Sequence, residues 1–307
     1  MSSATLAHYA QYYGIRGSVA ALRRLSFERA SAIGERIGTL GYRPLGIRRA
    51  VVERQVSAAF PGLTEPEVER IARASYASLG RTTIETTLLP TYSREQVLEL
   101  VDHTEGWEHV ERALAGGRGL MIVTGHLGNW ELGGSYLAAR GIPLEAVARR
   151  MENPLFDAYM TETRRRIGMA VIHDADAVRR VPRAMREDHA VAFLVDQGAV
   201  GLASTWVPFF GRYAKTPRGP AVFALRLKTP LLFACALRQP GGRFVIHFEP
   251  VPVEETGTLD ADVDRIVASY TSSLERWVRR APEQYFWQHR RWKHQRPGTP
   301  PELGDPS

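Results

Sequence analysis

From about residue 100 onward, short apolar runs alternate with stretches of helical periodicity, and this alternation constrains the fold more than any other feature. Apolar runs near residues 120–123, 144–147, 170–172, 190–195 and 231–236 have the length of strands, and helical patterns separate most of them. A strand that is followed by a helix usually returns parallel to its neighbour. The sequence therefore predicts an α/β fold with a mostly parallel central sheet flanked by helices.

Residues 1–100 contain amphipathic helical segments and no strand pattern. One of these helices is predicted to begin at Thr64, which is a good N-cap residue and is followed by a proline in the first turn. We expect a helical N-terminal extension over residues 1–100, packed on an α/β core over residues 101–298 and followed by a flexible tail at 299–307.

The composition excludes several classes of protein. The chain has 307 residues, of which 44% are hydrophobic and 24% are charged, as in globular proteins. The single cysteine, Cys235, excludes an internal disulfide and a multi-cysteine zinc site. We expect neither a metal nor a cofactor.

No apolar run reaches the roughly 18 to 20 residues that span a bilayer. Residues 1–25 include five His, Gln and Arg side chains and lack a continuous apolar core, which makes them a poor signal peptide and a poor anchor. We expect a protein that stays in the cytoplasm and contacts a membrane only peripherally.

The basic residues are unevenly distributed. The net charge is +7, and only three of the 40 basic residues are lysines. Residues 16–54 carry nine arginines against three glutamates, and residues 275–296 carry seven basic residues against two glutamates. Such segments favour an anionic membrane surface. Nucleic-acid binding is the usual alternative, but no nucleic-acid motif is present, and a soluble arginine-rich surface would explain the same pattern.

The most informative segment lies around His126. An apolar strand is predicted to end at Thr124, a turn follows at Gly125, and Asn129 is a good N-cap for the next helix. This places His126 at the carboxyl end of a strand, where ligands bind in open α/β sheets.

Glu131 follows His126 by five residues. On a continuous helix it would point roughly 140° away, but the glycine-containing turn can bring the two together, and a carboxylate on one ring nitrogen prepares the other to accept a proton. The alternative is a structural histidine and an ordinary acid in a first helical turn. The spacing does not match the usual zinc-binding pairing.

These residues carry a resemblance to a known family. Residues 125–131, Gly-His-Leu-Gly-Asn-Trp-Glu, resemble the His-x4-Glu block of the lipid A biosynthesis acyltransferases, the lauroyl and myristoyl transferases to which the mycobacterial phosphatidylinositol mannoside acyltransferases are related. Three further blocks resemble the family in the same order: Arg149 with Asn153-Pro154; Asp196-Gln197 with residues 207–211 and Thr216; and residues 282–293. The resemblance covers roughly residues 45–298.

The chain departs from the family pattern in two places. Family members usually begin with a hydrophobic anchoring helix, of which residues 1–25 are a weak version, and Gln55-Val56 replaces a common Asn-Leu.

The resemblance implies a glycerolipid acyltransferase-like fold and transfer of a fatty acyl group from an acyl thioester to a hydroxyl of a membrane saccharolipid, such as a lipid A precursor. It implies that His126 is the general base and that Glu131 orients it. The donor would be a thioester of acyl carrier protein or of coenzyme A, and the protein would work at the cytoplasmic face of the inner membrane. No serine or cysteine nucleophile is needed if the hydroxyl attacks the thioester directly, and backbone N–H groups near residues 125–129 or an arginine could stabilise the oxyanion.

The expected substrate-binding residues come from the same blocks. Arg149 would grip a phosphate, or else be a solvated surface arginine. Residues 207–211 would form an apolar wall for the acyl chain, or else ordinary core. The full set is Gly128, Asn129, Arg149, Asn153, Asp196, Gln197, Phe209, Gly211 and Thr216.

Two other functions fit the sequence. One is acylation of a phosphatidylinositol mannoside or a lysophospholipid by the same residues. The other is a lipid-binding protein that keeps the fold without turnover, which the intact pair of His126 and Glu131 disfavours.

Overall fold

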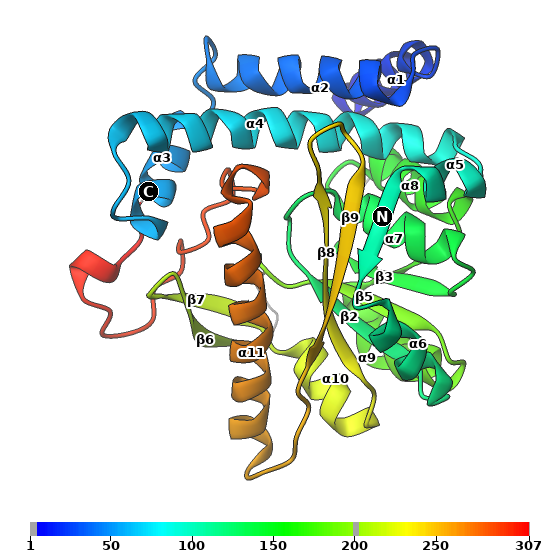
Figure 1. Cartoon of the computed structure of the whole chain (residues 1–307), viewed down its shortest axis with the longest axis vertical. Helices are drawn as coiled ribbons and strands as arrows, with labels where there is room; N and C mark the ends of the chain where they lie inside the picture. Colours follow the sequence, from blue (N-terminus) through cyan, green and yellow to red (C-terminus); the bar gives the residue numbers. More distant parts are fainter. Residues whose placement is uncertain (1–4, 199–202, 307) are drawn as a thin grey trace.

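A seven-stranded sheet forms the centre of the computed structural model, which describes residues 5–198 and 203–306 (Figure 1). The strand order is β1-β9-β8-β2-β5-β3-β4, and every neighbouring pair is parallel except β8 and β9. This confirms the predicted α/β fold with a mostly parallel sheet. The strands are β1 (Val101–Glu105), β2 (Leu120–Thr124), β3 (Leu144–Ala148), β4 (Met169–His173), β5 (Ala190–Leu194), β8 (Leu231–Arg238) and β9 (Phe244–Val251).

Helices cover both faces of the sheet, as the alternating pattern predicts. On one face, Leu120 and Ile122 of β2 belong to an apolar cluster that also contains residues of α5, α6 and α7. On the other face, Met121 and Val123 join a cluster with residues of α9, α10 and α11. The helices of this region are α6 (Trp107–Ala115), α7 (Trp130–Ala139), α8 (Pro154–Arg166), α9 (Ala177–Arg186), α10 (Gly219–Leu227) and α11 (Leu259–Arg280).

The N-terminal helices lie along one end of the sheet, where α2 and α4 run side by side (Figure 1). The helix predicted from Thr64 is present, with a capping box between Thr64 and Glu67. Glycines allow α2 and α4 to approach closely, since a Cβ atom on Gly38 would lie 2.0 Å from the carbonyl oxygen of Tyr76. The helices are α1 (Leu6–Leu22), α2 (Phe27–Tyr42), α3 (Arg49–Ala59), α4 (Glu65–Leu88) and α5 (Arg94–Glu99).

A separate β-hairpin lies between β5 and α10. It consists of β6 (Ser204–Phe209) and β7 (Arg212–Pro217), which pair antiparallel around a turn where Phe210 and Gly211 have positive φ.

The segment after α11 packs against the loop that follows β2. Tyr285, Trp287 and Trp292 are buried, and Leu127 forms a β-bridge with Tyr285. Gln55 of α3 holds this segment, since its side chain donates to the carbonyl oxygens of Trp287 and His289 and accepts from the backbone N–H of Arg291.

Residues 299–307 were expected to be a flexible tail, but the described part of this segment makes contacts. Pro301–Leu303 form a 3-10 turn, the carbonyl oxygen of Gly304 accepts from Arg212, and Asp305 pairs with Arg290. Among the described residues, none of the helices combines the length and apolar character needed to cross a membrane.

Candidate active site

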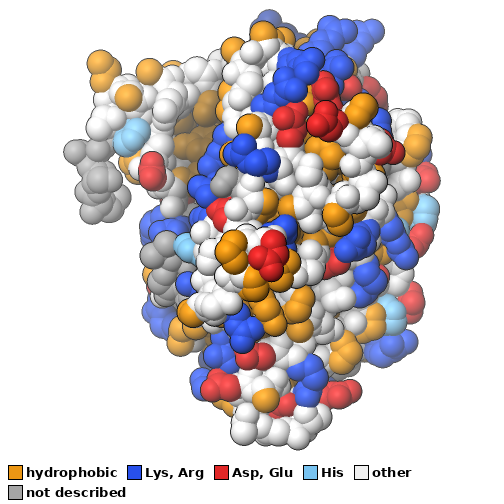
Figure 2. Space-filling model, turned by 90° about the vertical axis from the view of Figure 1, so that its left-hand side faces the viewer, with side chains coloured by type: hydrophobic (Ala, Val, Ile, Leu, Met, Phe, Trp, Pro, Cys, Tyr) orange, Lys and Arg blue, Asp and Glu red, His pale blue; other side chains and the backbone are white. Residues whose placement is uncertain are grey.

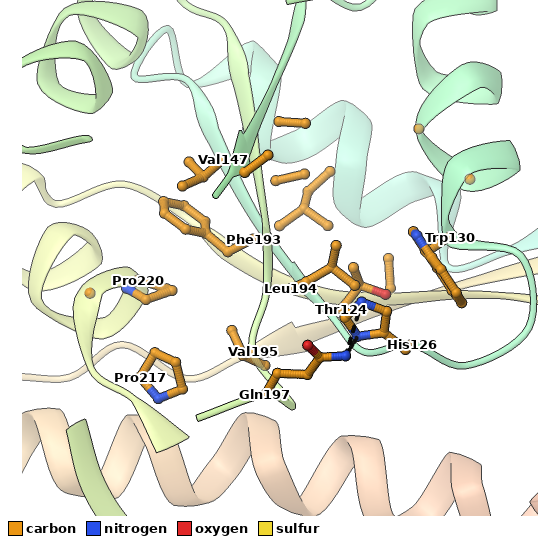
Figure 3. A pocket seen from close by; sticks show the side chains of 18 of the residues that line it. Thr124, His126, Trp130, Val147, Phe193, Leu194, Val195, Gln197, Pro217 and Pro220 are labelled. Carbon is orange, nitrogen blue, oxygen red and sulfur yellow. Dashed lines mark hydrogen bonds between the residues drawn. The ribbon is translucent and has the colours of Figure 1, made fainter. Parts of the chain in front are cut away.

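A cavity of about 710 Å³ lies at the carboxyl ends of β2, β3 and β5 (Figure 3). Most of its wall is apolar, and Thr124, His126 and Gln197 bring polar groups to one region of it. Apolar side chains of the wall include Ile122, Leu137, Leu144, Val147, Phe193 and Phe223.

His126 is held by a carboxylate from the neighbouring strand. Its Nδ1 lies 2.7 Å from Asp196 Oδ1, and its backbone N–H donates to Asp196 Oδ2 at 2.9 Å. The sheet dictates this meeting, because β2 and β5 are parallel neighbours with Thr124 opposite Leu194, and both residues lie two positions further on. An ionised carboxylate at Nδ1 places the ring hydrogen there and leaves Nε2 to accept a proton.

Asp196 is buried, with 2% of its surface exposed, yet it stays ionised. Burial alone would raise its pKa, but the charge of His126, the hydrogen bonds from His126 and the charge of Arg291 together lower the pKa from 3.8 to about 2. Arg291 is itself buried, and it donates to the carbonyl oxygen of Lys215 and to Thr216. Asp196 is therefore anionic at neutral pH and stabilises a positive charge on His126.

The structure corrects the predicted pairing of Glu131 with His126. Glu131, in the first turn of α7, accepts two hydrogen bonds from Arg164 of α8, one of them from Nε at 3.1 Å. Both side chains of this nearly buried ion pair line the cavity. Asp196, expected to bind substrate, is the carboxylate that orients His126.

Aromatic and polar groups surround the His126 ring. Trp130 meets it edge-on with ring centroids 4.7 Å apart, and Gln197 Nε2 lies 3.4 Å from both ring nitrogens (Figure 3). His289 also lines the cavity, and its Nε2 is buried without a hydrogen-bond partner in the described part of the chain. Burial lowers the pKa of His289 from 6.5 to about 4, so this ring is neutral at pH 7.

Gly128 and Asn129, expected to bind substrate, instead anchor the loop that follows His126. Gly128 has a φ of 64°, and a Cβ atom there would lie 2.0 Å from the carbonyl oxygen of Ala236. Asn129 is fully buried, caps α7 by accepting from the backbone N–H of Leu132, and donates to Glu85 of α4 at 2.9 Å.

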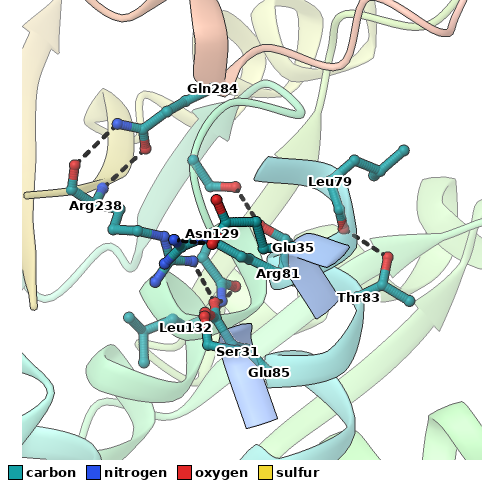
Figure 4. Close-up of polar contacts among 12 residues, drawn as sticks. Ser31, Glu35, Leu79, Arg81, Thr83, Glu85, Asn129, Leu132, Arg238 and Gln284 are labelled. Carbon is teal, nitrogen blue, oxygen red and sulfur yellow. Dashed lines mark hydrogen bonds and ion pairs between the residues drawn. The ribbon is translucent and has the colours of Figure 1, made fainter. Parts of the chain in front are cut away.

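Glu85 is the centre of a buried polar network that ties the N-terminal helices to this loop (Figure 4). Besides the hydrogen bond from Asn129, it accepts from Ser31 of α2 and from Arg238 of β8. Two backbone hydrogen bonds link Arg238 in turn to the side chain of Gln284. The position of His126 thus depends on α4 as well as on the sheet.

Of the two predicted substrate-binding residues in the second block, Arg149 lines the cavity and Asn153 does not. Arg149 follows β3, lines the cavity and is exposed, and its side chain has no ion pair among the described residues, which agrees with a substrate contact. Its neighbour Arg150 lies 3.9 Å from Asp157. Asn153 does not line the cavity: it caps α8 by accepting from two backbone N–H groups and donates to α1 at the carbonyl oxygen of His8.

The third block belongs mostly to the core. Phe209 is fully buried and packs on Phe210 and Trp292, Gly211 forms the turn of the hairpin, and Thr216 accepts a hydrogen bond from Arg291. None of these three residues lines the cavity, so the expected acyl-chain wall at residues 207–211 is core packing.

The sequence reasoning missed several residues of the cavity wall. Arg164 gave no signal, because it begins a run of three arginines on a helix. His289 and Lys293 lie within the C-terminal block that resembles the family, and their place in that block was the available signal.

One cluster of residues could in principle hold a metal ion. Glu145, Glu187 and His189 lie near the start of β5, at the opposite end of that strand from His126. Arg180 pairs with Glu145 at 2.8 Å and Arg183 with Glu187 at 2.9 Å, so arginines already neutralise both carboxylates.

Comparison with known proteins agrees with the site. The model of the family described as bacterial lipid A biosynthesis acyltransferase matches residues 2–294. The chain belongs to this family.

The relatives include the lipid A biosynthesis palmitoleoyltransferase of Escherichia coli, 28% identical over 267 residues, which are 85% of this chain and 84% of the relative. The lauroyltransferase of the same bacterium is 26% identical over 269 residues, 87% and 86% of the two chains. The phosphatidylinositol mannoside acyltransferase of Mycobacterium tuberculosis is 28% identical over 163 residues, 52% of each chain. The resemblance inferred from the sequence blocks is confirmed.

Proposed function

We propose that this protein transfers a fatty acyl group from an acyl thioester to a hydroxyl of a membrane saccharolipid such as a lipid A precursor. The observation that carries the proposal is the geometry of His126, whose Nδ1 is held by buried Asp196 at the edge of an apolar cavity. The names of the relatives support acyl transfer and a lipid acceptor. We expect acyl carrier protein or coenzyme A to carry the thioester.

The reaction needs one general base. Nε2 of His126 takes the proton of the acceptor hydroxyl as its oxygen attacks the thioester carbonyl carbon. The tetrahedral intermediate collapses, the carbon–sulfur bond breaks, and the proton passes from His126 to the departing thiolate. The negative charge of Asp196 stabilises the imidazolium between these two steps, without itself taking the proton.

The cavity wall suits an acyl chain. Burying each CH₂ group stabilises the bound donor by about 0.8 kcal/mol, and the side chains of Leu137, Leu144 and Phe193 provide apolar contacts. The ion pair of Glu131 with Arg164 also belongs to this wall, and it fixes the position of α7 against α8. Because the two charges neutralise each other, the mechanism gives this pair no part in proton transfer.

The acceptor lies in a membrane, and α1 provides a means of contact. Leu6 and Tyr13 are 87% and 65% exposed, and Figure 2 shows apolar side chains on the projecting N-terminal helix with basic side chains on the neighbouring surface. Exposed apolar groups beside arginines favour shallow insertion into an anionic leaflet. We therefore expect peripheral attachment at the cytoplasmic face of the inner membrane.

The test compares two carboxylates. With a labelled acyl thioester and a lipid acceptor, His126→Ala should lower kcat by roughly 10² to 10⁴-fold, because the base is lost. Asp196→Asn should lower kcat by roughly 10²-fold or more, because an amide neither fixes the tautomer nor offsets the imidazolium charge. Glu131→Gln should be milder, because Arg164 keeps an acceptor. Exposed His103→Ala is the control.

If Glu131→Gln proves as damaging as His126→Ala while Asp196→Asn turns over normally, the assignment of Asp196 is wrong. The similarity to the mycobacterial relative supports a second candidate, acylation of a phosphatidylinositol mannoside. Offering both acceptors with one donor distinguishes the two. Transfer to neither acceptor, with tight lipid binding, would support a lipid-binding protein without turnover.

A further inference from the structure

A group of basic side chains borders the cavity near Gly198, apart from Arg149. Lys293 and Gly198 both line the cavity. A methyl group built on Gly198 would lie 3.5 Å from Cδ2 of His294 and 3.8 Å from Cβ of Lys215. Lys293 is exposed, whereas Lys215 on β7 and His294 are half-buried. Lys293 thus lines the cavity itself, and Lys215 and His294 lie against Gly198, which also lines it; these three residues are here called the lysine cluster.

In the described part of the chain, no carboxylate forms an ion pair with the lysine cluster. Neither lysine has an ion pair within residues 5–198 and 203–306, although many arginines of the chain are paired with carboxylates. Residues 199–202 follow Gly198 in the sequence and lie outside the described residues; they are Ala-Val-Gly-Leu, none of which is acidic. Burial, Lys293 and Lys215 all lower the pKa of His294, so the two ammonium groups act on the same ring. Both ammonium groups therefore disfavour a positive charge on His294, and a bound anion would offset them.

The choice of residue is informative. Only three of the 40 basic residues are lysines, and two of these lie in this cluster. An ammonium group is a compact charge with three donors on a flexible stem, which suits the oxygens of a phosphate. The third lysine, Lys228, is the C-cap of α10 and belongs neither to the cavity wall nor to the lysine cluster.

We infer that Lys215, Lys293 and His294 bind a phosphate ester of one of the two substrates while its acyl chain or hydroxyl occupies the cavity. This inference rests on the proposed function and deepens it. Two sources supply the same chemistry: the phosphate on the pantetheine arm of the thioester donor, and a phosphate on the acceptor lipid. In either case, the bound phosphate fixes the reacting group with respect to His126.

The test uses the double variant K215Q/K293Q in the full chain, with K228Q as a control that makes the same Lys-to-Gln change once, outside the cavity wall. If the donor supplies the phosphate, KM for the donor rises about tenfold or more in the double variant, as expected for the loss of charge-assisted hydrogen bonds, while KM for the acceptor stays within twofold. If the acceptor supplies the phosphate, KM for the acceptor rises about tenfold or more, while KM for the donor stays within twofold. If both KM values stay within twofold of K228Q, the inference is wrong.

A binding measurement separates this inference from failure of the proposed function. Acyl-pantetheine 4′-phosphate and acyl-pantetheine are titrated separately against the protein, as are phosphorylated and dephosphorylated acceptor lipid in detergent. Tryptophan fluorescence serves as the readout, because Trp206 pairs with Lys215 across the hairpin.

The native protein should prefer the phosphorylated form of one pair, and K215Q/K293Q should lose that preference even if no acyl transfer occurs. An equal preference in K215Q/K293Q and K228Q overturns the inference. By contrast, H126A should lose turnover but keep the phosphate preference, because the lysine cluster acts in binding and His126 in catalysis.

Discussion

At the scale of single residues, the half-buried imidazole of His289 lies in the cavity wall, and its surroundings lower its pKa. The Nε2 atom is buried in the cavity wall without a hydrogen-bond partner among the described residues. Burial, together with the positive charges of Lys293, Arg291 and His126, lowers the pKa of His289, and the negative charge of Asp196 opposes them only in part. The folded protein therefore holds this imidazole in its neutral form well below the pH at which a free histidine takes up a proton.

We predict a pH dependence of stability from this shift. The pKa of His289 is 6.5 in the unfolded chain and about 4 in the folded protein, so only the unfolded chain binds the proton between these values. The free energy of unfolding should therefore fall as the pH falls from 6.5 to 4, by about 1 to 3 kcal/mol from this residue. Urea unfolding at pH 7.5 and 4.5 should show a smaller loss for His289→Gln than for the native protein.

The exposed His103→Gln is the control for this measurement, and its loss should match that of the native protein. If His289→Gln and the native protein lose the same stability over this range, His289 is not the group responsible.

Sequence reasoning located the residues of the site better than it assigned their roles. His126, Gln197 and Arg149 were found because each follows an apolar strand, and the carboxyl ends of parallel strands share one edge of the sheet. Glu131 was assigned to His126 because the two lie in one His-x4-Glu block joined by a glycine-containing turn, and Asp196 was expected to bind substrate. Asp196 is 70 residues from His126, and only the pairing of β2 with β5 reveals that the two meet.

At the scale of elements, the packing of α2 on α4 depends on the absence of side chains. Gly34 and Gly38 face Gly80, and a Cβ atom on Gly34 would lie 2.4 Å from the carbonyl oxygen of Gly80. This approach also carries Ser31 to Glu85, and hence connects α2 to the network behind the His126 loop.

We predict that Gly38→Ala destabilises the protein by about 1 to 3 kcal/mol, because the added methyl group meets the backbone of α4 and the helices must separate. Gly14→Ala on α1 is the matched control, since nothing lies within 4 Å of its Cβ position. There, alanine should be neutral or stabilise by up to about 1 kcal/mol, because it has the higher helix propensity. Urea unfolding measures both, and equal stability of the two variants would show that α2 can shift freely on α4.

The elements themselves differ in how far the sequence reveals them. The helix from Thr64 carries its own start signal in the capping box, and β2 and β5 are recognisable as short apolar runs. No strand was predicted for the hairpin of β6 and β7. Its apolar residues, such as Phe209, were interpreted either as a wall for the acyl chain or as core, and the structure places Phe209 in the core. The local sequence shows only that a side chain is apolar. Whether it faces the cavity or the core depends on the elements that pack around it in the folded protein.

At the scale of the whole molecule, α1 packs against α8, which begins shortly after the cavity residues Arg149 and Met151. Asn153 connects α1 to the start of α8, and Tyr12 packs edge-on against Tyr159 of α8. The same region follows β3 and Arg149, which line the cavity. A membrane bound by α1 would therefore lie near the part of the cavity wall that Arg149 and Met151 form.

We predict that α1 mediates attachment to anionic vesicles by charge and apolar insertion together. Binding should weaken as the salt concentration rises, because the Debye length falls from about 10 Å at 0.1 M to about 3 Å at 1 M. L6D/Y13D should bind vesicles less tightly at every salt concentration and transfer less acyl chain to acceptor in a bilayer, yet keep its activity on acceptor dispersed in detergent. I37D/L40D is the matched control, since these α2 residues are 55% and 52% exposed. Equal binding by both double variants would move the membrane contact away from α1, and loss of activity on the dispersed acceptor would show that Leu6 and Tyr13 support the cavity itself.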